Sequence, residues 1–118
     1  MSWLALWAFY GAVGFLLIYA LWVFYLAVMN LKRARNAGLL TKTANALGLP
    51  VLFAGYALDL LVNALPMTVL LLELPQELTV TARLKRHIKT GTGWRFWLAR
   101  WFIPLLDPFD PSGRHITD

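Results

Sequence analysis

The N-terminal part of the chain contains a long segment without charge. From Ser2 to Leu31 there are thirty residues and not one Asp, Glu, Lys or Arg. A helix needs about 20 apolar residues to cross the hydrocarbon core of a bilayer. No Lys or Arg precedes the segment, and its apolar run is about twice as long as that of a secretory signal peptide. The sequence therefore predicts a transmembrane helix over residues 2–31 that stays in the mature protein.

Aromatic residues mark both ends of this segment. Trp3 and Trp7 lie near its beginning, and Trp22 and Tyr25 lie near its end. Ring side chains favour the headgroup level of a bilayer. A helix from Trp3 to Tyr25 is about 33 Å long, which is close to the roughly 30 Å of the hydrocarbon core. These positions fit two aromatic belts.

A second apolar segment runs from Leu47 to Leu72 and carries one charge, Asp59, near its middle. Its Leu, Val and Phe residues contribute about −4 to −8 kcal/mol to insertion, against about +2.5 to +3.5 kcal/mol for a central Asp. Pro66 lies in the interior and should kink or break the helix, because proline lacks the N–H of the helical hydrogen bond. We expect a transmembrane helix over residues 47–72 and a basic loop over residues 32–46.

Composition supports a membrane protein. Of the 118 residues 59% are hydrophobic and 14% are charged, and the mean hydropathy is +0.60, so the chain has more apolar surface than a soluble domain of this size can cover. No Ser/Gly/Pro-rich linker divides it, and we expect one membrane domain over residues 1–118. The absence of Cys excludes disulfides, thiolate metal sites and a Cys nucleophile.

The segment after Pro75 changes to a basic amphipathic pattern. Apolar residues recur every fourth position at Val80, Leu84 and Ile88, and Gly91-Thr92-Gly93 provides an end. Pro75 suits the first helical position and Glu77 the first turn, so we expect a helix over residues 75–90. Its remaining face is basic, with His87 expected in solvent.

Residues 94–106 have aromatic side chains at helical spacing, but the segment is too short to span. We expect an interfacial helix there, with Trp94, Trp97 and Trp101 in the headgroup zone and Arg95 and Arg100 toward phosphate. Residues 107–118 form the tail, in which Asp-Pro pairs favour type I turns. The predicted fold is an all-α membrane protein: a two-helix transmembrane hairpin, then short amphipathic and interfacial helices and an irregular C-terminal tail.

Positive charge leaves two topologies open. If both apolar segments span, the loop and the proximal tail lie on opposite sides, and one basic cluster breaks the positive-inside rule. We expect this simple hairpin, with both termini in the cytoplasm. Alternatively, the break at Pro66 makes the second segment re-entrant, which places both clusters in the cytoplasm. The loop cluster contains Lys32, Arg33, Arg35 and Lys42, and the tail cluster contains Arg83, Lys85, Arg86 and Lys89.

The second apolar segment carries a polar stripe formed by Gly55, Tyr56, Asp59 and Asn63, which lie on nearly the same side of the helix. A carboxyl group in the bilayer suggests an ion or proton site, or a gate. The stripe is better interpreted as packing against the first helix or another copy, with Asn63 bonded to Asp59, because a single carboxylate without a cationic partner is a poor relay.

Basic and aromatic residues after the second segment suit an anionic membrane surface. We expect lipid headgroups to bind the set that includes Lys32, Arg33, Arg35, Arg83, Lys85, Arg86, Lys89, Trp94, Arg95, Trp97, Arg100 and Trp101. Rings beside Lys and Arg also occur on single-stranded nucleic-acid surfaces, a less favoured interpretation.

The sequence shows no pattern typical of catalysis or of metal binding. Asp107, Asp110, Ser112 and His115 match no known metal spacing and are explained by turns. Paired carboxylates at a plausible site, a Ser/His/Asp order and a phosphate loop are also missing. We therefore expect no cofactor, no metal and no enzymatic activity.

Four segments resemble small membrane proteins of tailed phages and prophages in Gram-negative bacteria. They are residues 29–35, 56–63, 78–84 and the more specific 106–113, within a likeness from about Met29 to the C-terminus. The resemblance implies a host inner-membrane location and a phage role, and it brings no known activity.

Three hypotheses follow. The first is a non-enzymatic inner-membrane protein that oligomerises or binds a host membrane protein, as in superinfection exclusion or envelope modification. The second is a holin-like lysis protein, and the third is a membrane-tethered nucleic-acid-binding protein.

Overall fold

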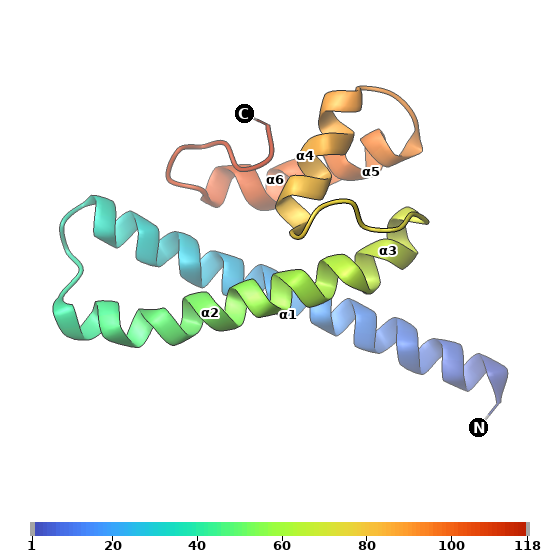
Figure 1. Cartoon of the computed structure of the whole chain (residues 1–118), viewed down its shortest axis with the longest axis horizontal. Helices are drawn as coiled ribbons and strands as arrows, with labels where there is room; N and C mark the ends of the chain where they lie inside the picture. The colour runs from blue at the N-terminus through green and yellow to red at the C-terminus, as the bar shows by residue number, and fades with distance from the viewer. Residues whose placement is uncertain (1, 118) are drawn as a thin grey trace.

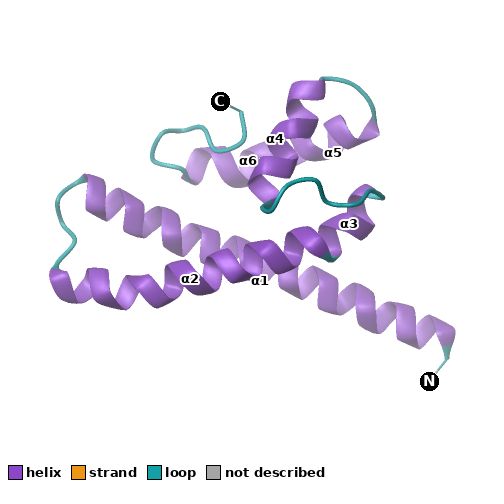
Figure 2. Ribbon diagram, viewed as in Figure 1, coloured by secondary structure: helices purple, strands orange, loops and turns teal. Residues whose placement is uncertain are grey.

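The computed structural model describes residues 2–117, and its regular elements are all helical (Figure 1, Figure 2). In chain order they are α1 (Trp3–Asn36), α2 (Lys42–Ala64), α3 (Pro66–Leu71), α4 (Val80–Thr90), α5 (Trp94–Trp101), α6 (Ile103–Leu106) and the 3₁₀ turn η1 (Asp107–Phe109). The predicted all-helical composition is therefore confirmed.

The connection between α1 and α2 is much shorter than predicted. The basic loop over residues 32–46 is wrong, because only residues 37–41 lie outside the two helices. Lys, Arg and Ala are good helix formers, and the cations Arg33 and Arg35 in the last turn of α1 are favourable at the negative end of the helix dipole. Thr41 begins α2 by accepting a 3.1 Å hydrogen bond from the Ala44 amide.

The second apolar segment is broken at Leu65, as Pro66 predicted. Leu65 has φ −109° and ψ −80°, outside the helical range, and Pro66 becomes the start of α3. α3 ends at Leu71, and Leu72 adopts the left-handed conformation with φ 51°. The segment 47–72 is thus two helices joined at an angle.

α1 and α2 lie antiparallel and in close contact. A Cβ added at Gly48 would lie 3.2 Å from Leu31 Cδ1, and one added at Gly55 would lie 3.6 Å from Phe24 Cβ. The absence of side chains at these two positions lets the helices approach. The helices cross, and the N-terminal half of α1 projects away from the rest of the molecule (Figure 1).

Residues 73–117, hereafter the cap, fold over one side of α1 and α2 (Figure 1). A small core joins the cap to α2 and α3 and consists of Val62, Met67, Leu71, Val80, Leu84, Ala99 and Ile116. From α1, Leu17, Ile18 and Leu21 pack against this core.

The helices of the cap differ in detail from the prediction. Thr79 Oγ1 accepts a hydrogen bond from the Ala82 amide at 3.2 Å, so α4 begins at Val80 and not at Pro75. Gly91 ends it with φ 75°, as expected. The predicted helix over 94–106 is interrupted at Phe102, because Pro104 has no N–H for the carbonyl four residues earlier. The tail is irregular, as predicted, apart from the 3₁₀ turn η1 at its start.

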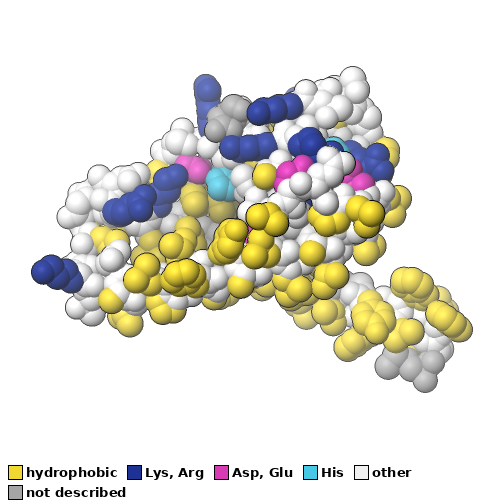
Figure 3. Space-filling model, in the orientation of Figure 1, with side chains coloured by type: hydrophobic (Ala, Val, Ile, Leu, Met, Phe, Trp, Pro, Cys, Tyr) yellow, Lys and Arg dark blue, Asp and Glu magenta, His cyan; other side chains and the backbone are white. Residues whose placement is uncertain are grey.

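α1 and α2 leave most of their apolar surface uncovered. In an apolar 18-residue part of α1 only 6% of the residues are buried, and in the corresponding part of the helical stretch Lys42–Leu71 only 11% are. Both stretches are long and apolar enough to cross a membrane. Figure 3 shows hydrophobic side chains along α1 and α2, while Lys and Arg gather over the cap and at the end where α1 meets α2.

Candidate functional site

The polar stripe of α2 does not act as one unit. Gly55 is buried against α1, as the packing interpretation predicted. Tyr56 is 51% exposed. Asp59 and Asn63 instead face the cap. The predicted hydrogen bond between them is wrong, because Asn63 donates to the Glu77 carbonyl and Asp59 accepts from the Val80 amide.

Asp59 caps α4 from another helix. Its Oδ1 accepts a 2.8 Å hydrogen bond from the amide of Val80, the first residue of α4. The first amides of a helix lack partners within the helix, and a carboxylate there also faces the positive end of the helix dipole. Together with the side chain of Thr79, Asp59 therefore fixes where α4 begins.

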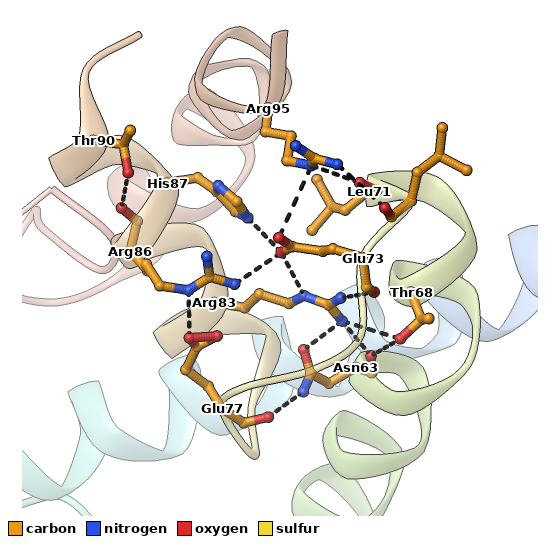
Figure 4. Close-up of polar contacts among 11 residues, drawn as sticks. Asn63, Thr68, Leu71, Glu73, Glu77, Arg83, Arg86, His87, Thr90 and Arg95 are labelled. Atoms are coloured by element: carbon orange, nitrogen blue, oxygen red, sulfur yellow. Dashed lines mark hydrogen bonds and ion pairs between the residues drawn. The ribbon is translucent and has the colours of Figure 1, made fainter. Parts of the chain in front are cut away.

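Arg83 is the largest fully buried side chain of the described residues, with an exposed fraction of 0%. Its guanidinium donates at 2.6 Å to the carbonyl oxygens of Asn63 and Glu73, and at 3.3 Å to Thr68 Oγ1 (Figure 4). The expectation that Arg83 binds lipid headgroups is wrong. Arg83, which lies in α4, instead connects this helix to the end of α2 and to α3.

Glu73 is the centre of an ion cluster that the sequence analysis missed. Its Oε1 accepts hydrogen bonds from Arg86 at 2.8 Å and from His87 at 2.6 Å, and Arg83 lies on the same oxygen at 3.3 Å (Figure 4). Burial alone would raise the pKa of Glu73, but the hydrogen bonds from His87, Arg86 and Arg83 lower it to about 2. The prediction that His87 is solvated is also wrong, because it is 5% exposed.

Two further cations tie the cap together. Arg86 Nε donates to Glu77 Oε2 at 2.6 Å. Arg95 Nε donates to the Leu71 carbonyl at 2.7 Å, where α3 ends (Figure 4). Its guanidinium lies over the Trp94 ring. Arg86 and Arg95 are half-buried, so part of each side chain stays accessible.

The remaining predicted surface residues do lie at the surface. Lys89, Arg100, Trp94, Trp97 and Trp101 are exposed, and Arg100 lies over the Trp97 ring at 5.3 Å. Lys85 is half-buried. Their role at lipid headgroups stays a prediction.

The C-terminal tail is held by two carboxylates. Asp107 accepts from the amides of His115 at 2.7 Å and Ile116 at 2.9 Å, and from the Thr117 hydroxyl. Asp110 accepts from the Ser112 amide at 2.9 Å, and the Gly113 amide closes the turn on the Asp110 carbonyl at 2.8 Å. The turn predicted over residues 110–113 is therefore confirmed.

The tail and α6 also bind α1. Trp22 Nε1 donates to the Leu105 carbonyl at 2.8 Å, and the Tyr25 hydroxyl donates to the Leu106 carbonyl. Lys32 Nζ lies 3.8 Å from Asp110 Oδ1, and Arg33 donates to the Phe109 carbonyl at 3.3 Å. Trp22 and Tyr25, predicted as part of a headgroup belt, also hold the end of the chain against α1. Their place at the headgroups stays a prediction.

A chain of hydrogen bonds links Thr81, His115 and Asp110. Thr81 Oγ1 is 2.9 Å from His115 Nε2, and His115 Nδ1 is 2.9 Å from Asp110 Oδ2. Burial would raise the pKa of Asp110, but hydrogen bonds from Ser112 and His115 lower it to about 2. The order of hydroxyl, imidazole and carboxylate resembles that of a hydrolase, yet here it joins α4 to the tail, and the hollows described below lie between α1 and α2.

Within residues 2–117, no group of three or more His, Asp and Glu side chains is placed to hold a metal ion. The polar contacts of Asp59, Asn63, Glu73 and Asp110 all run within the chain. The arrangement is that of a cap locked onto two apolar helices, with α1 extending beyond it. Comparison with protein-family models, with curated proteins and with solved structures gave no match.

Proposed function

We propose that the chain is a small, non-enzymatic membrane protein of phage or prophage type, held in the host inner membrane, that acts by binding a helix of another membrane protein. Support for the membrane comes from the exposed apolar surface. Trp3, Trp7 and Phe53 are 75%, 67% and 70% exposed, on helices that a soluble protein would use as its core. Such surfaces are stable in hydrocarbon.

The position of the cap supports a particular topology. The cap contacts α1 from Trp22 to Arg33 and contacts α2 at Asp59 and Asn63. If α1 and α2 crossed the bilayer as an upright pair, the charged groups of the cap would lie beside them in hydrocarbon, which costs several kcal/mol for each unpaired charge. The cap instead lies at one membrane surface, with α2 beneath it.

α1 is then the crossing helix, and α2 with α3 is re-entrant. α1 has 34 residues and is about 50 Å long, so it can cross the roughly 30 Å core and leave its last turns, with Lys32 and Arg35, at the headgroup level. α2 enters beside α1, and the break at Leu65 returns the chain to the cap. All eleven Lys and Arg follow Leu31, so this topology places every one of them on the same side. By the positive-inside rule that side is the cytoplasm, and Ser2 is outside.

The observation that carries the function is the uncovered N-terminal half of α1. Ala8, Gly11 and Ala12 are exposed, and apart from its chain neighbours and the backbone of its own helix no atom of the described residues lies within 4 Å of a Cβ added at Gly11. Small residues let two helices approach closely in lipid, where packing drives helix association. Residues 3–13 of α1 form about 16 Å of helix, so a partner can meet this part across about half of the hydrocarbon core.

Crosslinking in the membrane tests this proposal. The chain has no Cys, so Ala12→Cys gives a single reactive thiol on α1. We expect an adduct with a second copy or with another membrane protein, which Gly11→Leu abolishes and Ala57→Leu, at an exposed position of α2, leaves intact. An α1 that gives no adduct, or a collapse of the membrane potential when the chain is produced in a bacterial host, would overturn the proposal, the latter in favour of a lysis protein.

A further inference from the structure

A groove lies between the last turns of α1 and the first turns of α2. It has a volume of about 230 Å³, and its apolar walls include Val28, Leu31, Leu49 and Leu52. Gly48 contributes no side chain, and a Cβ there would lie 3.2 Å from Leu31 Cδ1. Gly48 therefore lets Leu31 pack directly against the backbone of α2 at one side of the groove.

The groove changes from apolar to cationic along its length. Lys32, Arg35 and Asn45 line it, and a second hollow of about 280 Å³ shares Arg35, Leu40 and Asn45 and adds Thr41 and Lys42. The two hollows form one surface that begins with leucines and ends with three cations. No Asp or Glu lines either hollow.

The cations at this end differ from the two cations at the centre of the cap, Arg83 and Arg86. Arg83 and Arg86 are paired with Glu73, and Arg86 also with Glu77. Among residues 2–117, Arg35 and Lys42 have no carboxylate partner, and Lys32 is 3.8 Å from Asp110 and 40% exposed. The groove therefore presents uncompensated positive charge beside an apolar wall.

We propose that this groove binds one anionic phospholipid. The phosphate lies among Lys32, Arg35 and Lys42, with Asn45 and Thr41 as further hydrogen-bond partners, and an acyl chain follows the wall of Val28, Leu31, Leu49 and Leu52. Basic pockets between helices at the cytoplasmic surface recognise anionic headgroups in this way. A soluble anion would use the cations and leave the apolar wall exposed, whereas a phospholipid satisfies both. The inference rests on the proposed membrane location and adds a specific lipid to it.

Lipid retention by the purified full chain tests the proposal. The protein is exchanged into bilayer discs that contain equal amounts of phosphatidylglycerol and phosphatidylcholine, extracted gently, and the bound lipid is quantified. We expect retention of phosphatidylglycerol in preference to phosphatidylcholine. A charge near the surface contributes about 1 kcal/mol, or about a five-fold change in affinity, so Arg35→Gln with Lys42→Gln should lower the affinity about 25-fold.

Two matched variants separate the groove from general surface charge. Lys89→Gln with Arg100→Gln removes the same charge from exposed positions of the cap and should retain the lipid. Leu52→Trp fills the apolar end at a position that is 47% exposed and should release the lipid without a change of charge.

Three results would overturn the lipid site. They are equal loss in both charge variants, retention in Leu52→Trp, and displacement of the lipid by soluble glycerol phosphate. A chain that does not enter the discs at all would instead contradict the proposed membrane location.

Discussion

The indole of Trp22 in α1 donates a 2.8 Å hydrogen bond to the carbonyl oxygen of Leu105, eighty-three positions later in the chain. Eleven residues further along α1, Arg33 donates to the carbonyl of Phe109. The end of the cap thus follows α1 over about 16 Å of helix. α1 has two parts: from Leu17 onward it packs against the rest of the chain, and the turns before Gly14 are free.

Replacing Trp22 tests this docking. Trp22→Phe keeps a ring and removes the hydrogen bond to the Leu105 carbonyl, which should cost about 0.5–1.5 kcal/mol. We expect faster proteolysis within the last fifteen or so residues of the membrane-bound protein. Trp7→Phe, at an exposed position of the free part of α1, should be cleaved at the wild-type rate. Equal rates for all three proteins would mean that the cap is not held at Trp22.

Arg83 should be the most sensitive position of the cap. Arg83→Ala leaves the Glu73 carboxylate and the Asn63 carbonyl short of a buried partner, and breaking such a cluster costs about 3–5 kcal/mol. Thermal unfolding in detergent, followed by circular dichroism, should show a much lower midpoint. Lys89→Ala, on the same helix but exposed, should stay within about 0.5 kcal/mol of the wild type. A headgroup-binding Arg83 would give the opposite result, with little change in the unfolding midpoint.

Asp59 distinguishes a structural carboxylate from one that must ionise. Asp59→Asn keeps an oxygen that accepts from the Val80 amide, so stability and any function should be nearly unchanged. Asp59→Leu removes the acceptor and should cost about 0.5–2 kcal/mol, as for the loss of other helix caps. Hydrogen exchange at the first amides of α4 measures this directly. A loss of function in Asp59→Asn with normal protection of these amides would indicate a proton site instead.

Acid should loosen the cap in a defined range. The pKa of Glu73 is lowered from 4.5 to about 2, and that of Asp110 from 3.8 to about 2. A carboxylate with a depressed pKa stabilises the fold fully above its ordinary pKa and loses that contribution as the pH falls toward the depressed value. We expect constant cap stability from pH 7 to about 5 and a decline below about 4.5.

Tryptophan fluorescence of the protein in detergent follows this transition. Glu73→Gln is the matched variant, since it removes one of the titrating groups and should make the decline shallower. A decline that begins near pH 6 would assign the transition to other groups.

Local sequence signals predicted the elements that depend on neighbouring residues. The uncharged run placed α1, Pro66 placed the break after α2, and Gly91 placed the end of α4, because each effect acts within one or two turns of backbone. The start of α4 could also have been predicted, since Thr79 before an apolar periodic run is a typical helix cap. Pro75 gave a competing signal, and the choice between the two depends on Asp59, which is distant in sequence.

The ion cluster could not be predicted in the same way. Arg83 looked like one of several cations on a basic helix, and its burial follows from Asn63, Thr68 and Glu73, which come from other segments. The presence of Glu73 and Glu77 shortly before Arg83 and Arg86 was the available signal for ion pairs. Sequence spacing alone does not say which of these side chains meet, because α3 and the following loop first have to turn the chain back.

The most direct test of the proposed topology is the accessibility of three single-cysteine variants, since the chain has no Cys of its own. Ser2→Cys, Leu39→Cys and Thr92→Cys place a thiol at the start of α1, between α1 and α2, and between α4 and α5. A membrane-impermeant maleimide applied to intact spheroplasts should label Ser2→Cys at once, and label Leu39→Cys and Thr92→Cys only after the membrane is permeabilised. Labelling of Leu39→Cys and Thr92→Cys from opposite sides would contradict the account, because α2 and α3 would then cross the bilayer and the cap could not lie beside the end of α1.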